Sequence, residues 1–481
     1  MQRKFLTNLA LLLFLNLLIK PFWILGIDRS VQNTVGDAYG FYFVIFNFSF
    51  MFNILLDMGI TNFNNRNIAQ NKQLLNKHLS GILIVKVLLL LVYVVVTYTV
   101  ALIIGFEGEQ LYLLGWICFN QFLLSFVLYL RSNISGLLLF KTDSFMSILD
   151  RMLMILFCSI LLWGHLFEQP FQIEWYVYAQ TLAYSLTFLI AFIIVSNKAG
   201  FKKLNWNWPF FVMIVKRSFP FATLVLLMTI YYRSDSIFIE RLLPKEVGEV
   251  QTSIYAQAFR LLDAANMIPM LFAVLLLPIF SRMIKNNESV VQMVKLSYSL
   301  LLTLSVITAI GSTFYRFELM ELLYLDNNYA ASLIFGKIMF SFIAISSIYV
   351  FGSLLTANGN LRQLNIISVV ALIVNFTLNI ILVPKYLALG SAYANLATQF
   401  VAAVPQIILA CVVFKFKLDI RYIASIFILI LGVIIISYAS KELQYNWYYG
   451  FTGMILLSLI LASALKLLSI RGFIRIIREK E

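Results

Sequence analysis

The residues of this sequence that could carry chemistry are charged side chains embedded in long apolar stretches. Arg233 and Asp235 follow the uncharged run FPFATLVLLMTI, and Lys20, Arg260 and Asp263 stand in similar surroundings. A charge at the centre of a bilayer costs roughly 2.5–3.5 kcal/mol on insertion scales, so such residues face a polar cavity or pair with one another. Because basic residues outnumber acidic ones in these stretches, the chemistry that they indicate is anion binding.

The composition of the chain shows that these charges lie in membrane-spanning segments. Of 481 residues, 61% are hydrophobic and 12% are charged, and the mean hydropathy is +0.90. Soluble domains have roughly 45–50% apolar and about 25% charged residues. Apolar runs of about 20 residues, long enough to cross about 30 Å of hydrocarbon, recur along the whole chain. The sequence therefore predicts an all-α polytopic membrane protein.

The apolar runs predict about fourteen transmembrane helices. We expect them at residues 5–27, 39–60, 79–104, 111–130, 144–164, 174–195, 218–240, 254–280, 293–314, 331–356, 364–383, 390–412, 421–438 and 447–467. The connection containing WNWPFFVMIVKR suits an interfacial helix, because tryptophans and an apolar face adjoin a basic end. It divides the chain into a six-helix bundle at 1–197, a cytoplasmic linker at 198–217, a second six-helix bundle at 218–412, and two extra helices with a basic tail at 413–481.

The distribution of lysine and arginine predicts the orientation. Most of these residues fall in the segments on the side of the two termini, whereas the opposite loops hold only Arg29, Arg241, Lys245, Arg316, Lys385 and Lys441. By the positive-inside rule, both termini are cytoplasmic. Topology and contact with anionic headgroups of membrane lipids account for the net charge of +14. Nucleic-acid binding is not needed to explain it.

Histidine and cysteine are too sparse for common site chemistries. His78 and His165, with Cys118, Cys158 and Cys411, form neither a disulfide framework nor a zinc site of usual spacing. No G-x-x-x-x-G-K-[ST] motif is present, and the longest connections are too short for a catalytic domain. We therefore expect no metal, no cofactor and no enzymatic activity, although a membrane glycosyltransferase or polymerase is the enzyme to be weighed against transport.

Depth groups several of the embedded charges. At 1.5 Å per residue, Lys20 and Arg233 lie about 22 Å from the cytoplasmic edge, and Arg260 and Asp263 lie about 10–15 Å below the outer edge. These positions fall within one band of the membrane. Arg260 and Asp263, three residues apart, can share a helix face, whereas Arg233 and Asp235 cannot. The band suits a central cationic cavity, but it also suits salt bridges that join the helices at 218–240 and 254–280.

The other embedded charges leave similar alternatives. Lys86 and Arg151 lie about 10 Å from the cytoplasmic edge, where they could line the same cavity or extend to the interface, and Asp150 could pair with Arg151. Asp57, Asp235 and Asp263 could pair helices or couple transport to an ion. Asn375 and Asn379, four residues apart, predict hydrogen bonds between helices or contact with sugar.

Four stretches carry a resemblance to known proteins: LLDMGITNFNNRNIAQN, DSIFIERLLPKEVGEVQTSIYAQAFRLL, LLPIFSRM and LLTANGNLRQLNIISVVALIVNFTLNIILVPKYLALGSAYANLATQ. They resemble one family, the polysaccharide flippases of the multidrug/oligosaccharidyl-lipid/polysaccharide exporter superfamily. Two departures concern loops: Gly248 and Tyr255 are seven residues apart where the family usually has two, and Leu387 stands where the family favours glycine.

The resemblance implies a transporter that moves an undecaprenyl-pyrophosphate-linked oligosaccharide across the bacterial inner membrane. Its two bundles would rock around a cationic cavity, with Arg66 at a cytoplasmic gate and polysaccharide polymerase machinery as a possible partner. The product would serve O-antigen, capsule or exopolysaccharide synthesis. A lipid II flippase and a cation-coupled drug exporter, both of the same superfamily, are the alternatives. The drug exporter would favour an acidic site, unlike the embedded charges here.

Overall fold

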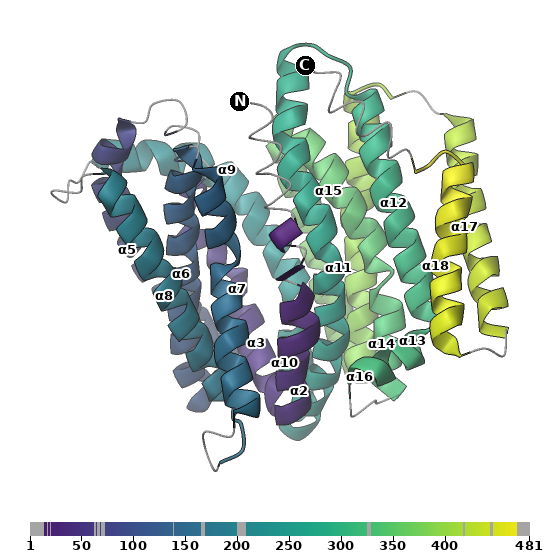
Figure 1. Ribbon diagram of the computed structural model, residues 1–481, viewed down its shortest axis with the longest axis horizontal. Coiled ribbons are helices and arrows are strands. Elements are labelled where there is room, and N and C mark those ends of the chain that lie inside the picture. Colours follow the sequence, from purple (N-terminus) through teal and green to yellow (C-terminus); the bar gives the residue numbers. More distant parts are fainter. Residues whose placement is uncertain are drawn as a thin grey trace. The chain divides into compact units, whose positions relative to one another are not determined.

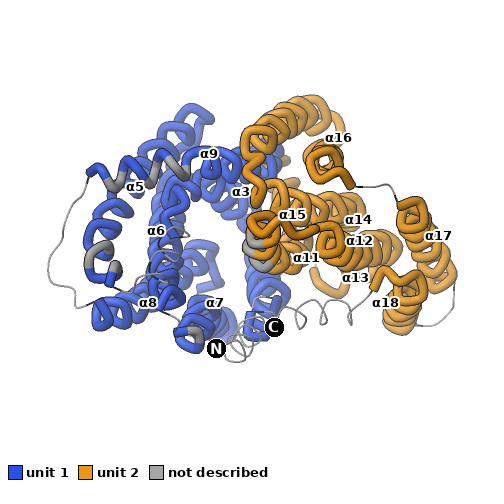
Figure 2. Tube along the Cα trace, turned by 90° about the horizontal axis from the view of Figure 1, so that it is seen from above, with its two compact units in different colours: residues 1–240 blue, residues 241–481 orange. Residues whose placement is uncertain are grey.

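A computed structural model describes the chain at residues 14–16, 18–19, 21–61, 64, 68, 73–137, 139–164, 169–199, 208–324, 329–416, 419–442 and 446–468. Every regular element in these ranges is helical, which confirms the all-α fold class. The chain forms two compact units, Met1–Glu240 and Arg241–Glu481, coloured separately in Figure 2.

Unit 1 contains η1 (Trp23–Asp28), α2 (Arg29–Val35), α3 (Ala38–Met51), η2 (Asn53–Leu56), α5 (Leu74–Ile104), α6 (Glu109–Gly136), α7 (Phe140–Trp163), α8 (Ile173–Ala199), α9 (Trp208–Arg233) and most of α10 (Asp235–Leu242). Figure 1 labels these elements. Helix α8 packs on α6 and α7, and α3 packs on α6 and α9. Unit 1 therefore includes α9, whereas the second predicted bundle begins at residue 218, within this helix. The division of the chain into two six-helix bundles stays a prediction.

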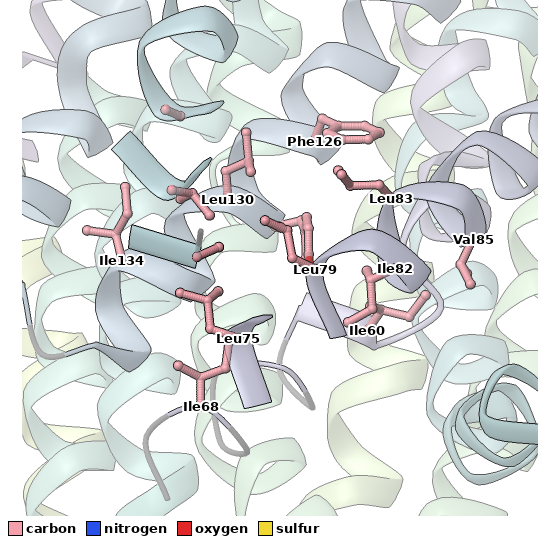
Figure 3. Close-up of a cluster of buried hydrophobic side chains, with 14 of the residues drawn as sticks. Ile60, Ile68, Leu75, Leu79, Ile82, Leu83, Val85, Phe126, Leu130 and Ile134 are labelled. Carbon is pink, nitrogen blue, oxygen red and sulfur yellow. The ribbon is translucent and has the colours of Figure 1, made fainter. Parts of the chain in front are cut away.

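An apolar cluster holds α5 and α6 together in unit 1. Figure 3 shows Leu79, Ile82 and Leu83 of α5 with Phe126 and Leu130 of α6. All five side chains are buried, and burial of an apolar side chain of this size contributes roughly 1.5–3 kcal/mol. Lys86 lies one turn after Leu83 in α5, and Ser125 directly precedes Phe126 in α6. These two polar groups therefore border a buried apolar region that excludes water.

The first two predicted helices differ from the observed ones. The helix predicted to end at 27 continues through the π-helical η1 into α2, and it ends at Val35 before Gly36, whose φ is 58°. The helix predicted at 39–60 ends as an α-helix at Met51 and is followed by the 3₁₀ turn η2. Sequence periodicity reports an average of 3.6 residues per turn, so it does not resolve a single turn of π or 3₁₀ geometry.

Unit 2 contains α11 (Lys245–Lys285), α12 (Val291–Phe314), α13 (Arg316–Leu323), α14 (Tyr329–Ile338), α15 (Ser341–Ala357), α16 (Leu361–Val413), α17 (Ile420–Glu442) and α18 (Trp447–Ala464). Helix α15 packs on α11, α12 and α16. Helices α17 and α18 pack on each other and on α12. An apolar cluster that includes Leu302, Val306, Leu429, Val433 and Met454 fills the space between these three helices.

Two predicted helices, 364–383 and 390–412, appear as one element, α16, with a sharp break at Leu387. Leu387 has φ 56° and ψ −140°, a conformation that glycine adopts readily and leucine rarely does. A Cβ added at Gly390 would lie 2.3 Å from the carbonyl oxygen of Leu382, so the chain can fold back closely only because residue 390 is glycine. Leu387, which stands where the family favours glycine, is thus the residue at which α16 bends.

The described helices account for the predicted number of crossings. Nine are long and apolar enough to cross a membrane, or ten when the bent pair α9 and α10 is counted as one span. Those nine treat α16 as a single span, although its 53 residues fold back at Leu387 and supply two. The described segment from η1 to α2, helix α3 and helix α11 lie at or beside the remaining predicted crossings. The protein is a multi-pass membrane protein with about fourteen transmembrane helices.

Candidate functional site

Lys86 and Asp57 form a buried ion pair in unit 1. The ammonium Nζ of Lys86 lies 2.6 Å from Oδ1 of Asp57, and the Lys86 side chain is only 1% exposed. Nζ also donates to the carbonyl oxygen of Leu56 at 3.0 Å and to Oγ of Ser125 at 2.9 Å. Asp57 in turn accepts from the backbone N–H and the hydroxyl of Thr61. Lys86 is therefore surrounded by oxygen acceptors from two segments, the end of η2 with Asp57 and helix α6.

This pair stands where a membrane helix breaks. After η2 the chain turns through Met58 and Gly59, whose φ values are 46° and 82°. A turn of this kind removes helical partners from the preceding carbonyl groups, and an unsatisfied backbone group inside a membrane costs several kcal/mol. Lys86 and the Ser125 hydroxyl both donate to Leu56, so the lysine caps the broken end.

Arg151 of α7 lies among aromatic rings. Its guanidinium carbon is 5.8 Å from the ring centroids of both Trp23 and Tyr184. Its Nε lies 3.5 Å from Oδ2 of Asp150. The ion pair between these neighbours, which the sequence allows, is therefore present but long. Aromatic faces attract a cation but do not neutralise it, so Asp150 is the acid that balances part of the charge of Arg151.

Asp28 is an acid that was not among the predicted site residues. It ends the π-helical η1 and is 2% exposed, and its two carboxylate oxygens accept from the hydroxyls of Tyr39 and Tyr176. The ring of Tyr176 stacks on Trp23 at 5.9 Å. Because the predicted first helix ended at 27, Asp28 fell in a loop by sequence. Single π-turns inside helices occur frequently at functional sites.

Arg233 and Asp235 stand on either side of a second helix break. Helix α9 ends at Arg233, α10 begins at Asp235, and the two helices are bent by 46° at Ser234. The sequence predicted one helix at 218–240, and that prediction is wrong at this turn. Serine and aspartate side chains compete with helical hydrogen bonds, and three of them follow Arg233 in sequence. Asp235 is buried, whereas Arg233 is partly exposed.

Contacts from α3 hold the Arg233 side chain. Its Nη1 donates to Oδ1 of Asn47 at 3.2 Å, and the Asn47 amide donates to Oγ of Ser236 at 3.3 Å. The guanidinium carbon lies 5.1 Å from the ring centroids of Phe50 and Tyr232. Asn47 was not a predicted site residue; the only signal in sequence is an amide inside the apolar run GFYFVIFNFSF.

The remaining candidates divide between unit 2 and the undescribed part of the chain. In unit 2, Nη1 of Arg260 is 4.0 Å from Oδ2 of Asp263, so these residues share a face of α11 as their spacing predicts. Lys20 and Arg66 lie outside the described residues. Within the described ranges, no group of three His, Cys, Asp or Glu side chains is placed to hold a metal ion.

Asn375 and Asn379 are buried in α16, and they take part in hydrogen bonds beside its break at Leu387. The amide of Asn379 donates to the carbonyl oxygen of Asn375 at 2.9 Å, and its Oδ1 accepts from the hydroxyl of Ser391. Ser391 lies beyond Leu387, so the bond joins the two halves of the folded helix. In addition, Oε1 of Gln251 accepts from the backbone N–H of Ala388 at 3.3 Å.

Solved structures with the same fold are membrane transporters. The lipid II flippase MurJ in an inward closed conformation matches with a TM-score of 0.71 at 14% identity, over 97% of this chain and 99% of that one. A mutant of the Vibrio cholerae MATE transporter VcmN matches with a TM-score of 0.59 at 17% identity, over 85% and 98%. A MOP superfamily transporter from Pyrococcus furiosus, described by a reversed polarity of its binding pocket, matches with a TM-score of 0.56 at 12% identity, over 85% and 94%.

These matches define the class, which is the fold of the MOP exporter superfamily. The family model of the polysaccharide biosynthesis proteins matches residues 30–284, just over half of the chain. The chain belongs to that family. None of the curated proteins matches the sequence.

Proposed function

We propose that this protein flips an undecaprenyl-pyrophosphate-linked oligosaccharide from the cytoplasmic to the outer leaflet of a bacterial inner membrane, by alternating access and with no enzymatic step. The proposal places both termini in the cytoplasm and makes the product available to polysaccharide polymerase machinery. It rests on one observation: Arg233 lies at the bend of a transmembrane segment, where Asn47 and the rings of Phe50 and Tyr232 hold its guanidinium.

The physical reason is the charge of the substrate head. A pyrophosphate carries several negative charges, and arginine binds such oxyanions through charge-assisted, often bidentate hydrogen bonds. These bonds are stronger in a water-poor site than in bulk water. The prenyl tail can remain in lipid while the head crosses. Arg151, with its aromatic neighbours, and Arg260 are the other cations of this proposal. Lys86 has enough oxygen partners to serve as a helix cap instead.

Complementation of a strain that lacks this gene tests the proposal. Arg233→Ala and Arg260→Ala are each expected to lower surface polysaccharide at least about tenfold at normal protein levels, because one charge-assisted contact is lost. Arg421→Ala changes an exposed arginine at the start of α17 and is the matched control. Full export at normal levels contradicts the anion site, and low protein levels favour a salt-bridge role.

The same strain separates the other substrates. The lipid II flippase MurJ has the same fold, and a protein with that substrate is required for growth unless it is duplicated. Loss of viability without a change in surface polysaccharide therefore favours lipid II. Increased sensitivity to cationic drugs, with normal polysaccharide, favours a drug exporter.

A further inference from the structure

Asn47 connects the two sides of the break between α9 and α10. Its amide oxygen accepts from Arg233 at 3.2 Å, before the break, and its amide nitrogen donates to Ser236 at 3.3 Å, after it. The Asn47 side chain is 1% exposed, so it has no water with which to exchange these bonds. A guanidinium has no acceptor, so the amide can face Arg233 only with its oxygen. The orientation of the amide is thereby fixed.

Phe50 completes the contact from α3. It lies three residues after Asn47, on the same face of the helix. The Arg233 guanidinium carbon is 5.1 Å from its ring centroid and equally far from that of Tyr232. Ring faces cover the flat surfaces of a guanidinium, whereas its N–H groups point outward in its plane. Asn47 takes one N–H of Nη1, so α3 fixes the plane in which the other N–H groups of Arg233 point.

We propose that Asn47 is the positioning residue that aims Arg233 at a phosphate-type oxyanion of the substrate. The inference rests on the proposed function and names the group that gives Arg233 its direction. Asn47 is neutral: it accepts one hydrogen bond from Arg233 and adds no negative charge beside the guanidinium. A carboxylate of the same shape at this position also accepts that bond, and its negative charge opposes the binding of an anion.

This reasoning separates positioning from simple packing. Asn47→Ala removes the hydrogen bond and changes no charge, so a positioning role predicts weaker anion binding at retained stability, whereas a packing role predicts lower stability and unchanged anion affinity of the folded protein. Asn47→Asp keeps the shape and adds a negative charge beside Arg233. Its stability is expected to stay unchanged, and its anion binding is expected to fall more than that of Asn47→Ala.

Binding of farnesyl pyrophosphate to the purified full-length protein in lipid nanodiscs tests the inference, with farnesol as the uncharged probe. We expect Asn47→Ala to weaken farnesyl pyrophosphate binding about tenfold, and Asn47→Asp about a hundredfold, as hydrogen bonds to charged groups imply. Farnesol binding stays unchanged. Ser236→Ala, which leaves the Arg233 contact intact, weakens binding only about twofold.

A thermal unfolding measurement on the same samples supplies the control. Asn120 of α6 is also buried and donates to the carbonyl oxygen of Val177 at 3.3 Å. Asn120→Asp places a carboxylate against that carbonyl and lowers the unfolding temperature, whereas Asn47→Asp keeps it. If Asn47→Asp is as unstable as Asn120→Asp, the carboxylate does not meet the guanidinium and the inference is overturned.

Arg233→Ala distinguishes failure of the inference from failure of the proposed function. If Arg233→Ala loses binding while both Asn47 variants bind as the wild type does, Arg233 is a ligand but Asn47 does not position it. If Arg233→Ala binds normally, or the wild type does not discriminate the pyrophosphate from farnesol, the anion site itself is refuted and the inference falls with it.

Discussion

Two lysine–aspartate pairs in this protein have the same separation and opposite surroundings. Nζ of Lys86 lies 2.6 Å from Asp57 in unit 1, and Nζ of Lys295 lies 2.6 Å from Asp419 in unit 2. The side chains of the first pair are 1% and 23% exposed, and those of the second are 49% and 45% exposed. Separation alone therefore does not set the strength of an ion pair, because water screens the second pair and hardly reaches the first.

The surroundings also decide what each lysine can do. Lys86 has a carboxylate, a carbonyl and a hydroxyl as partners, and these fix it to the broken end of η2. Lys295 lies 4.9 Å from the ring centroid of Tyr422 and fastens the start of α17 to α12. A cation whose partners are a carboxylate, a carbonyl and a hydroxyl at a helix break holds structure, and in the proposed function Arg233, which α3 contacts through Asn47 and Phe50, serves an anionic ligand.

Removing the buried cation, Lys86, is the test of the contrast between the buried and the exposed ion pair that has the largest expected effect. Lys86→Met keeps the length of the side chain but removes the cation that pairs with Asp57, which keeps only the hydrogen bonds from Thr61, and one of the two donors to the carbonyl of Leu56. Breaking a buried pair on one side costs about 3–5 kcal/mol, so we expect a large fall in the free energy of unfolding and little folded protein in the membrane. Fluorescence-detected size exclusion of the solubilised protein, with heating, measures both.

Two variants control that measurement. Lys141→Met removes an exposed lysine from the first turn of α7 and leaves the unfolding temperature nearly unchanged. Adding Asp57→Asn to Lys86→Met removes the unmatched charge and recovers part of the loss. A stable, fully folded Lys86→Met single variant contradicts the capping role.

The break in α16 extends the contrast, because neutral groups hold it. Asn379, Ser391 and Gln251 bridge the fold there, and the remaining cost is the backbone conformation of Leu387. Leu387→Gly removes that cost, which is roughly 1–3 kcal/mol for a residue in a sparsely populated region. After the entropy that glycine loses on folding, we expect a gain of about 1 kcal/mol in the free energy of unfolding, seen as a higher unfolding temperature.

Leu387→Ala is the matched variant, since it removes the same side-chain surface but keeps a Cβ at the positive φ. It is expected to show no gain. A fall in stability for Leu387→Gly, or an equal gain for Leu387→Ala, means that the leucine side chain and not the backbone governs this position.

Leu387 also illustrates how far the sequence predicts this structure. The apolar runs predicted the helical class and the number of crossings, because a bilayer imposes one length on every span. The family's preference for glycine pointed to the residue that bends. The spacing of Arg260 and Asp263 predicted their shared face, because i and i+3 positions are neighbours on any α-helix.

The contacts that define the site could not be predicted in this way. Asn47 and Arg233 are 186 residues apart in sequence, and a single sequence does not record which helices are neighbours. Asp28 was missed because a π-helical turn shifts the helix end past the limit that a 3.6-residue period gives. The breaks after Leu56 and at Ser234 contain no proline, which is the usual sequence signal for a broken membrane helix.

The exposed pair should give the smallest effect, and its pH dependence identifies it. Hydrogen bonds from Lys295 and from the backbone N–H of Tyr422 lower the pKa of Asp419 below its ordinary value of 3.8. A carboxyl group whose pKa is depressed on folding adds stability above its unfolded pKa, and this contribution is lost as the pH falls through the folded pKa.

Asp419→Asn should therefore unfold at a slightly lower temperature than the wild type above about pH 5, and the difference should vanish below about pH 3. It should also shrink in 1 M salt, where the screening length falls to about 3 Å. A difference that persists in acid and in salt contradicts a role for the charge of Asp419, since the asparagine oxygen can still accept the hydrogen bond from Tyr422 and the variant lacks only the charge.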